Sequence, residues 1–144
     1  MTAIEMAFRR LEALDLAAIE STGDWGLGQM FNHLAQGVEF SMDGYPIEKP
    51  KLFRATVGTL AFKVFEMRGR MSHGLAEPIP GEVVAQLSAH DGMGRLWASL
   101  EKFRDFDGAL KPHFAYGGLN KLQFGKAHLF HIENHLEEVG PETV

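Results

Sequence analysis

The chain has 144 residues, a length that fits one domain, and we expect a single domain over residues 1–144. With 45% hydrophobic and 23% charged residues, its composition is that of a folded globular protein. The net charge of -5 argues against a nucleic-acid-binding protein, and the absence of cysteine excludes disulfides, cysteine nucleophiles and thiolate metal ligands.

The N-terminal segment and the hydropathy of the chain bear on its location. The first residues include Arg9 and Arg10 but also Glu5, Glu12 and Asp15, a mixture that secretory signals and transit peptides lack. No run of 18 apolar residues is present, so we expect no membrane-spanning segment. We therefore expect a cytoplasmic protein with neither a nucleic acid nor a membrane as its partner.

The first two expected elements are helices. Apolar residues recur at helical spacing over residues 4–19 and predict a first helix there. A turn follows at residues 21–24, and Asp24 is expected to cap the next helix. That second helix is predicted over residues 25–42 and ends at the Asp-Gly-Tyr-Pro sequence of residues 43–46.

The third expected helix has the cleanest amphipathic pattern in the sequence. It covers residues 51–67 and places six apolar residues on one face, namely Phe53, Val57, Leu60, Ala61, Val64 and Phe65. The following residues, 68–81, are too rich in glycine and proline for regular structure.

Two further helices are expected in the second half of the chain. The fourth is predicted over residues 82–106, with a break or kink near its start because Gly92 and Gly94 weaken a helix. The last is predicted over residues 119–139 and is ended by the Gly-Pro pair at 140–141. No segment alternates between polar and apolar residues for long enough to predict a strand. The expected class is therefore all-α, a bundle of four or five helices.

Three histidines form a stripe on the last expected helix. His131 and His135 are four residues apart, so their side chains lie on one face at a separation that suits two ligands of one metal ion. His128 is three residues from His131 but two turns, about 10 Å, from His135, too far to share one ion with it. The stripe thus offers one pair of ligands and one histidine left over.

A third ligand has to come from elsewhere in the chain. The candidates are His33 on the second helix and His73 and His113 in loops, whereas His90 is most simply a surface residue. His33 is flanked by apolar residues on a helix that has to pack, and bundle metal sites are built from facing helices in this way. The alternative interpretation is that these histidines are ordinary packing or surface residues, and spacing alone does not decide between the two.

Two separated segments resemble a known group of proteins. The sequence HLAQGVEFSMDGYP, residues 33–46, is similar to the second-helix signature of a family of unknown function within the DinB/YfiT-like superfamily. The sequence PHFAYGGLNKLQFGKAHLFHIENHL, residues 112–136, resembles the aromatic-glycine turn and final helix of that family. The resemblance extends from about residue 25 to residue 140.

The resemblance implies a DinB-like four-helix bundle with up-down-down-up topology and a long crossover between helices 2 and 3. It also implies a homodimer and one divalent transition metal, held here by His33, His131 and His135. His128 then neighbours the site without being a ligand. Asn134 stands where the family has the first histidine of an adjacent pair, and Phe124 stands where a tryptophan is expected.

Three histidine ligands leave a coordination position open, as in catalytic metal sites. The ion is expected to be zinc or nickel, with iron, cobalt and manganese as alternatives, because three imidazoles do not choose among them. We therefore expect a metal-dependent enzyme acting on a small molecule, either a thiol-dependent transferase, as among relatives in the superfamily, or a hydrolase. The alternatives are a protein that binds a metal or small ligand without turnover, and a structural metal site.

Several other residues are candidates for roles near the site. His113 is a weak candidate for proton transfer, and the aromatic residues beside it are candidates for a pocket wall. Gln29 and Gln36 lie on the helical face of His33 and are candidates for hydrogen bonds to the site. Glu39 and Glu138 are candidate carboxylate partners of the ligands, with solvated helix faces as the alternative.

Overall fold

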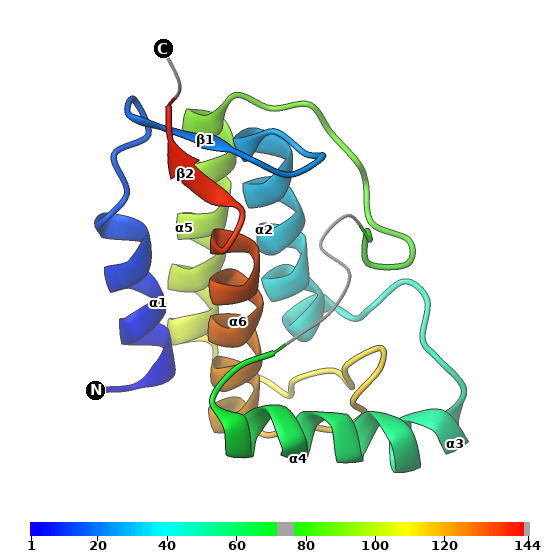
Figure 1. Ribbon diagram of the computed structural model, residues 1–144. Coiled ribbons are helices and arrows are strands. Elements are labelled where there is room, and N and C mark those ends of the chain that lie inside the picture. Colours follow the sequence, from blue (N-terminus) through cyan, green and yellow to red (C-terminus); the bar gives the residue numbers. More distant parts are fainter. Residues whose placement is uncertain (72–76, 143–144) are drawn as a thin grey trace.

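The computed structural model describes residues 1–71 and 77–142, and this part of the chain is mostly helical. Four helices lie side by side, namely α1 (Ala3–Glu12), α2 (Leu27–Asp43), α5 (Ala89–Asp105) and α6 (Lys121–Leu136). In Figure 1, α1 and α6 run upward while α2 and α5 run downward. The closest pairings are α2 with α5 and α1 with α6, and α2 also packs on α6. This α2–α6 contact brings together the two helices that carry the predicted ligands.

The connection from α2 to α5 takes up residues 44–88 and contains a further helical segment. This segment consists of α3 (Lys51–Phe53), the π-helix η1 (Arg54–Gly58) and α4 (Thr59–Arg68). In Figure 1 it lies across the lower end of the four packed helices, and residues 77–88 lead to the top of the view, where α5 begins.

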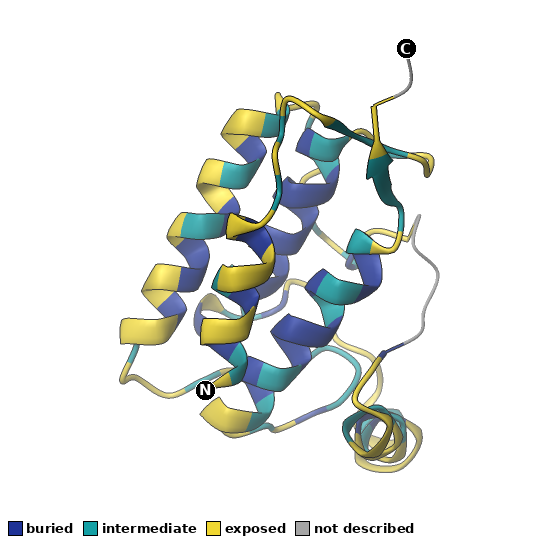
Figure 2. Ribbon diagram, turned by 60° about the vertical axis from the view of Figure 1, so that its left-hand side comes forward, coloured by how far each residue is buried: buried dark blue, intermediate teal, exposed yellow. Residues whose placement is uncertain are grey.

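The core lies between the four packed helices, which turn their buried faces inward (Figure 2). Its largest fully buried apolar side chains come from α2, α5 and α6, and include Phe31, Leu34, Leu96, Phe103 and Phe124. Within the described residues, no helix is long and apolar enough to cross a membrane.

Close packing of α2 on α5 depends on a glycine in α5. A Cβ atom at Gly92 would lie 2.6 Å from the carbonyl oxygen of Gly28, which is too close for any side chain. Gly92 therefore lets the backbones of α5 and α2 approach each other. The expected kink is absent, because α5 is one helix from Ala89 to Asp105.

The ends of two expected helices, the first and the last, were wrong. The first ends at Glu12 rather than near residue 19, because Ile19–Ser21 forms strand β1, which pairs antiparallel with β2 (Val139–Pro141). The last helix likewise ends at Leu136. The two strands have three residues each, too few to show a period of two, which explains why no strand was predicted.

Helix starts were misplaced for a different reason. The second helix begins after Gly26 rather than after Asp24. The fourth begins at Ala89, where the Ser88 hydroxyl accepts a hydrogen bond from the Asp91 amide at 3.0 Å. Residues 82–88 are therefore not helical, and they form an extended segment that is important for the site.

The amphipathic face predicted for residues 51–67 is not buried. Val57 and Leu60 are 57% and 63% exposed, and the buried positions are Gly58 and Phe62. Figure 2 shows α4 end-on and mostly exposed, apart from the packed helices. The π-helical turn of η1 contains an extra residue, so positions on either side of it no longer share one α-helical face. Sequence spacing assumes a regular α-helix and cannot detect this shift.

Candidate metal centre

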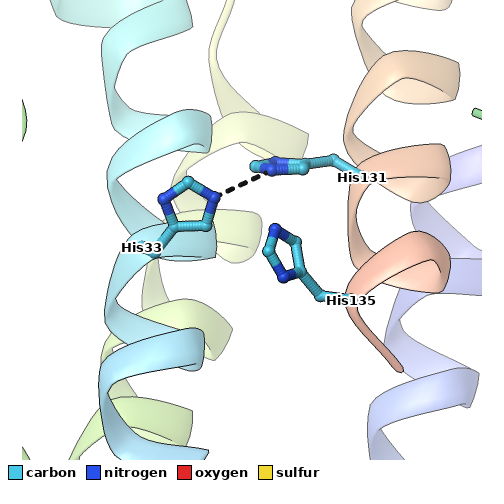
Figure 3. A group of neighbouring side chains, drawn as sticks. All are labelled: His33, His131 and His135. Atoms are coloured by element: carbon cyan, nitrogen blue, oxygen red, sulfur yellow. Dashed lines mark hydrogen bonds between the residues drawn. The ribbon is translucent and has the colours of Figure 1, made fainter. Parts of the chain in front are cut away.

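Three imidazoles converge between α2 and α6. His33 projects from α2, and His131 and His135 project from α6 (Figure 3). One ring nitrogen of each can be chosen such that all three lie within 4.8 Å of one another. Nε2 of His33 is 3.0 Å from Nε2 of His131, and the ring centroids are 4.8 to 4.9 Å apart. The structure thus brings together the three residues predicted as ligands.

The local sequence explains how the rings are placed. His131 and His135 follow each other by one helical turn, so both face α2. Gly37 follows His33 by one turn, and a Cβ atom there would lie 3.4 Å from Nδ1 of His131. The missing side chain leaves room for the His131 ring between the helices.

The ring nitrogen of His33 that does not face His131 contacts a carboxylate. Nδ1 of His33 lies 2.6 Å from Oε1 of Glu82, and the two side chains are only 1% and 3% exposed. Because an ionised carboxylate only accepts hydrogen bonds, Nδ1 of His33 carries the proton and donates it. In the neutral ring the other nitrogen, Nε2, has a lone pair, and this atom faces His131. Carboxylate–histidine pairs of this kind orient the imidazole ligands of metal sites.

Glu82 is itself held in place by the extended segment before α5. Its Oε1 also accepts a hydrogen bond from the Ile79 amide. Gln36 binds the backbone of Val83, the residue after Glu82. Its side-chain amide donates to the Val83 carbonyl and accepts from the Val83 N–H, each at 2.8 Å. Asn32 donates to the same carbonyl at 3.4 Å. Two side chains of α2 therefore fix the segment that presents Glu82 to His33.

Glu82 was missed by the sequence analysis. The residue lies 49 positions from His33 and was assigned to the start of a helix, so no spacing linked the two. Gln36 was correctly identified as a residue near the site, and Glu39 instead forms an ion pair with Arg95 at 2.9 Å. Trp25 also lies at the site, with its ring 4.9 Å from that of His33 and stacked at 5.9 Å on that of His135.

A cavity of about 270 Å³ adjoins the cluster. His33 and His131 lie in its wall, and His113, His128, Tyr45 and Tyr116 are among its other lining residues. This volume is near the lower end of ordinary small-molecule sites, roughly 300–1,000 Å³. Most of the remaining wall is apolar or aromatic, so the cluster borders a space suited to a small ligand.

His128 and His113 also line the cavity, and neither belongs to the three-histidine cluster. Burial lowers the pKa of His128 to about 3. Burial, with a smaller effect of the nearby His128, lowers the pKa of His113 to about 3 as well. Both rings are therefore neutral at physiological pH. The ring of His113 stacks on that of Tyr116 with centroids 4.1 Å apart.

The remaining candidate residues do not join the three-histidine cluster among the described residues. His90 is exposed on α5, in agreement with its assignment to the surface. His73 lies outside the described residues. Glu138 lies beside Gly23, close to where a Cβ of that residue would be, and its backbone amide donates a hydrogen bond to the His135 carbonyl at 3.0 Å.

Comparison with known proteins identifies a family for the chain. Residues 1–142 match the family described as "Protein of unknown function (DUF1569)", and because the match covers nearly the whole sequence, the chain belongs to this family. A search of curated proteins gave no match, and neither did a search of solved structures.

Proposed function

We propose that this member of the family binds one divalent transition metal through His33, His131 and His135 and acts on a small molecule in the adjoining cavity. The observation that carries the proposal is the convergence of three imidazole nitrogens from two helices within 4.8 Å, at the wall of a cavity. We further propose that the four packed helices form a DinB-like bundle, with residues 44–88 as its long crossover.

The residues present fit a metal ion. Neutral imidazoles are good ligands for zinc, nickel, iron and cobalt, and the carboxylate of Glu82 supports His33 from behind. The side chains of both ligand helices are buried around the cluster, so the rings are held in place. Zinc or nickel is the proposed ion, with iron, cobalt and manganese as alternatives.

The geometry favours a functional site over a structural one. Structural zinc sites have four protein ligands. Within the described residues, the only histidine, aspartate or glutamate group close enough to share an ion has three members, and one of them, His131, is partly exposed. A bound ion with a position open to the cavity would polarise a substrate atom or activate a nucleophile.

The proposed activity is that of a transferase, with a thiol as one of its substrates, or a hydrolase. Binding of a metal or small ligand without turnover is the second candidate, because a mostly apolar cavity supports binding whether or not a reaction follows. The cytoplasmic location and the homodimer are part of the same proposal, and sedimentation velocity on the purified protein tests the dimer.

Metal content tests the proposal directly. Protein purified without an affinity tag is analysed by elemental mass spectrometry as wild type and as the double variant His131→Ala/His135→Ala. We expect about one equivalent of a transition metal in the wild type and none in the double variant. His90→Ala is the matched control, because this exposed histidine lies outside the cluster and its loss should leave the metal content unchanged.

The outcome that would overturn the proposal is also specific. If wild-type protein contained no metal and took up neither zinc nor nickel on titration, the three histidines would be packing residues. If metal bound in the wild type, assays with a panel of thiols and electrophiles, and with ester and amide substrates, would then distinguish the enzyme from the binding protein.

A further inference from the structure

Besides the three clustered histidines, the cavity is lined by His113 and His128, which form its second histidine end and whose protons have fixed positions. Nδ1 of His113 accepts hydrogen bonds from the backbone amides of Ala115 and Tyr116, at 3.1 and 3.0 Å. A ring nitrogen that accepts from two N–H groups has no proton of its own, so the proton of His113 is on Nε2. Within the part of the chain that the structure describes, Nε2 makes no hydrogen bond. It is therefore a donor available to the cavity that His113 lines.

His128 is fixed in the same tautomer by a hydroxyl group. The Ser41 hydroxyl donates its only proton to the Val38 carbonyl at 2.6 Å. The contact of 3.1 Å between Ser41 Oγ and His128 Nε2 must then be donated by the histidine. Nδ1 of His128 is left with a lone pair, and no described residue donates to it. His128 thus offers the cavity an acceptor.

The two rings are neighbours, so the donor and the acceptor serve the same space. Each ring contacts the ring of Phe124. The centroid distance to Phe124 is 6.2 Å for His113 and 5.6 Å for His128. Both residues line the same cavity as His33 and His131. Neither ring has a carboxylate partner among the described residues, in contrast to His33. This end of the cavity therefore offers one donor and one acceptor without a charge.

We propose that His113 and His128 bind a neutral group that carries a hydrogen-bond acceptor beside a donor, such as a carboxamide, in the substrate of the three-histidine site. The carbonyl oxygen of that group accepts from Nε2 of His113, and its N–H donates to Nδ1 of His128. This subsite rests on the proposed function for the identity of the reactive end, but its occupancy does not require a metal. In this subsite His113 is a hydrogen-bond donor, whereas the sequence suggested proton transfer for this residue.

The aromatic wall favours a planar, uncharged ligand. The ring of His113 stacks on those of Phe114 and Tyr116, with centroids 4.8 and 4.1 Å apart, and the ring of Tyr45 is 5.1 Å from it. A carboxylate placed here would lose its hydration in exchange for one neutral donor, which is unfavourable. Lys49 also lines the cavity, and its ammonium lies 5.2 Å from the centre of the Phe53 ring. An anionic ligand would instead be drawn to that residue.

The test uses benzamide, benzoate and benzylammonium as probes of similar size and different charge. Binding to the full-length protein is followed by NMR titration, with and without one equivalent of zinc. We expect benzamide to bind at least 10-fold more tightly than the two charged probes. We also expect the ¹⁵N resonances of His113 Nε2 and His128 Nδ1 to move on binding. Benzoate binding as tightly as benzamide would assign the anchor to Lys49 and overturn the proposal.

Two variants distinguish the contribution of the hydrogen-bond donor to benzamide binding from the contribution of the ring shape. His113→Phe keeps a flat ring without a donor and should weaken benzamide binding by at least 10-fold, whereas His113→Gln keeps an N–H donor and should recover most of the affinity. Equal affinity in the wild type and in His113→Phe would contradict the proposal. If His113→Phe does not fold, the ¹⁵N spectrum of the wild type tests the proposal instead. Benzamide that binds without moving the His113 and His128 resonances would bind elsewhere and contradict the proposal.

The failure of this subsite can be distinguished from the failure of the proposed function. Zinc uptake is measured on the same samples, and the double variant His131→Ala/His135→Ala should lose zinc but keep benzamide binding. Zinc binding without benzamide binding overturns the subsite alone. Benzamide binding without zinc binding leaves the subsite intact and overturns the metal site.

Discussion

The two ends of the cavity each present histidines to the same space, but the groups behind those histidines differ. At one end, the carboxylate of Glu82 accepts from Nδ1 of His33, and Nε2 of the same ring faces the other proposed ligand His131. At the other end, backbone amides and a serine hydroxyl hold His113 and His128 as neutral rings. The comparison shows that the group bound to the second ring nitrogen determines what an imidazole can do. A carboxylate makes it a better metal ligand, whereas neutral groups in a buried place make it a fixed donor or acceptor.

The largest expected effect concerns the neutral end and its response to acid. Histidine in an unfolded chain has a pKa of about 6.5, while burial holds the pKa values of His113 and His128 near 3. Between these values the unfolded state binds more protons than the folded state. The free energy of unfolding should therefore fall as the pH decreases from 6.5 toward 3, by on the order of a few kcal/mol for each histidine.

Chemical denaturation at a series of pH values, in the presence of a chelator, measures this effect. His113→Phe should have a shallower dependence on pH than the wild type, although removing an acceptor for two amides also lowers its stability at neutral pH. The exposed His90→Ala is the control and should keep the wild-type slope. Identical slopes for His113→Phe and the wild type would show that His113 is not held neutral by the fold.

The next largest effect concerns the carboxylate behind His33. Glu82→Gln keeps the size of the side chain but replaces a charged acceptor with a neutral one. We expect metal affinity to fall by about 10- to 100-fold, the usual cost of losing such a partner. Competition with a chromophoric chelator measures the affinity. Glu77→Gln is the control, because this exposed carboxylate lies at the cavity but makes no contact with a ligand histidine.

If Glu82→Gln bound metal as tightly as the wild type, the carboxylate behind His33 would not improve this histidine as a metal ligand. The proposed difference between the two ends of the cavity would then be contradicted. A loss of affinity in the control as well would point to the overall charge of the cavity rather than to the contact with His33.

The smallest expected effect concerns the space around His131. A Cβ atom at Gly37 would lie 3.3 Å from Ile79 Cδ1 and 3.4 Å from His131 Nδ1, so Gly37→Ala should displace the ring by a few tenths of an ångström. We expect a loss of metal affinity of less than about 10-fold, because ligand geometry is disturbed without loss of a ligand. Gly94→Ala is the control, since nothing lies within 4 Å of a Cβ atom there.

Gly94→Ala should leave metal affinity unchanged and stabilise the protein by up to about 1 kcal/mol, as alanine favours a helix over glycine. Metal affinity that is the same in both variants and in the wild type would show that His131 has room to adjust.

The parts of the fold and site that follow from short-range spacing were predictable. The i, i+4 relation of His131 and His135 and the helical setting of His33 are visible in the sequence, and the structure brings these residues together. The helical character of the chain follows from its apolar periodicity. The expectation of an up-down-down-up topology came from the resemblance rather than from the periodicity.

The remaining features depend on contacts between distant residues. Glu82 reaches His33 from a segment that Gln36 helps to hold against α2, by binding the backbone of Val83, 47 positions away. The strands β1 and β2 form only by pairing with each other across most of the chain. The tautomers of His113 and His128 depend on hydrogen bonds that no local pattern encodes. In each case the chemistry is set by a tertiary neighbour.

The measurement that tests this account most directly is the ¹⁵N spectrum of the histidine rings, recorded at neutral pH before and after addition of one equivalent of zinc. We expect zinc to move the ring resonances of His33, His131 and His135 to positions typical of coordinated imidazole. His113 and His128 should stay neutral, with the proton on Nε2, before and after the addition. Zinc-induced coordination shifts at His113 or His128, or none at the three converging histidines, would contradict the division of the cavity into a metal-binding end and a neutral end.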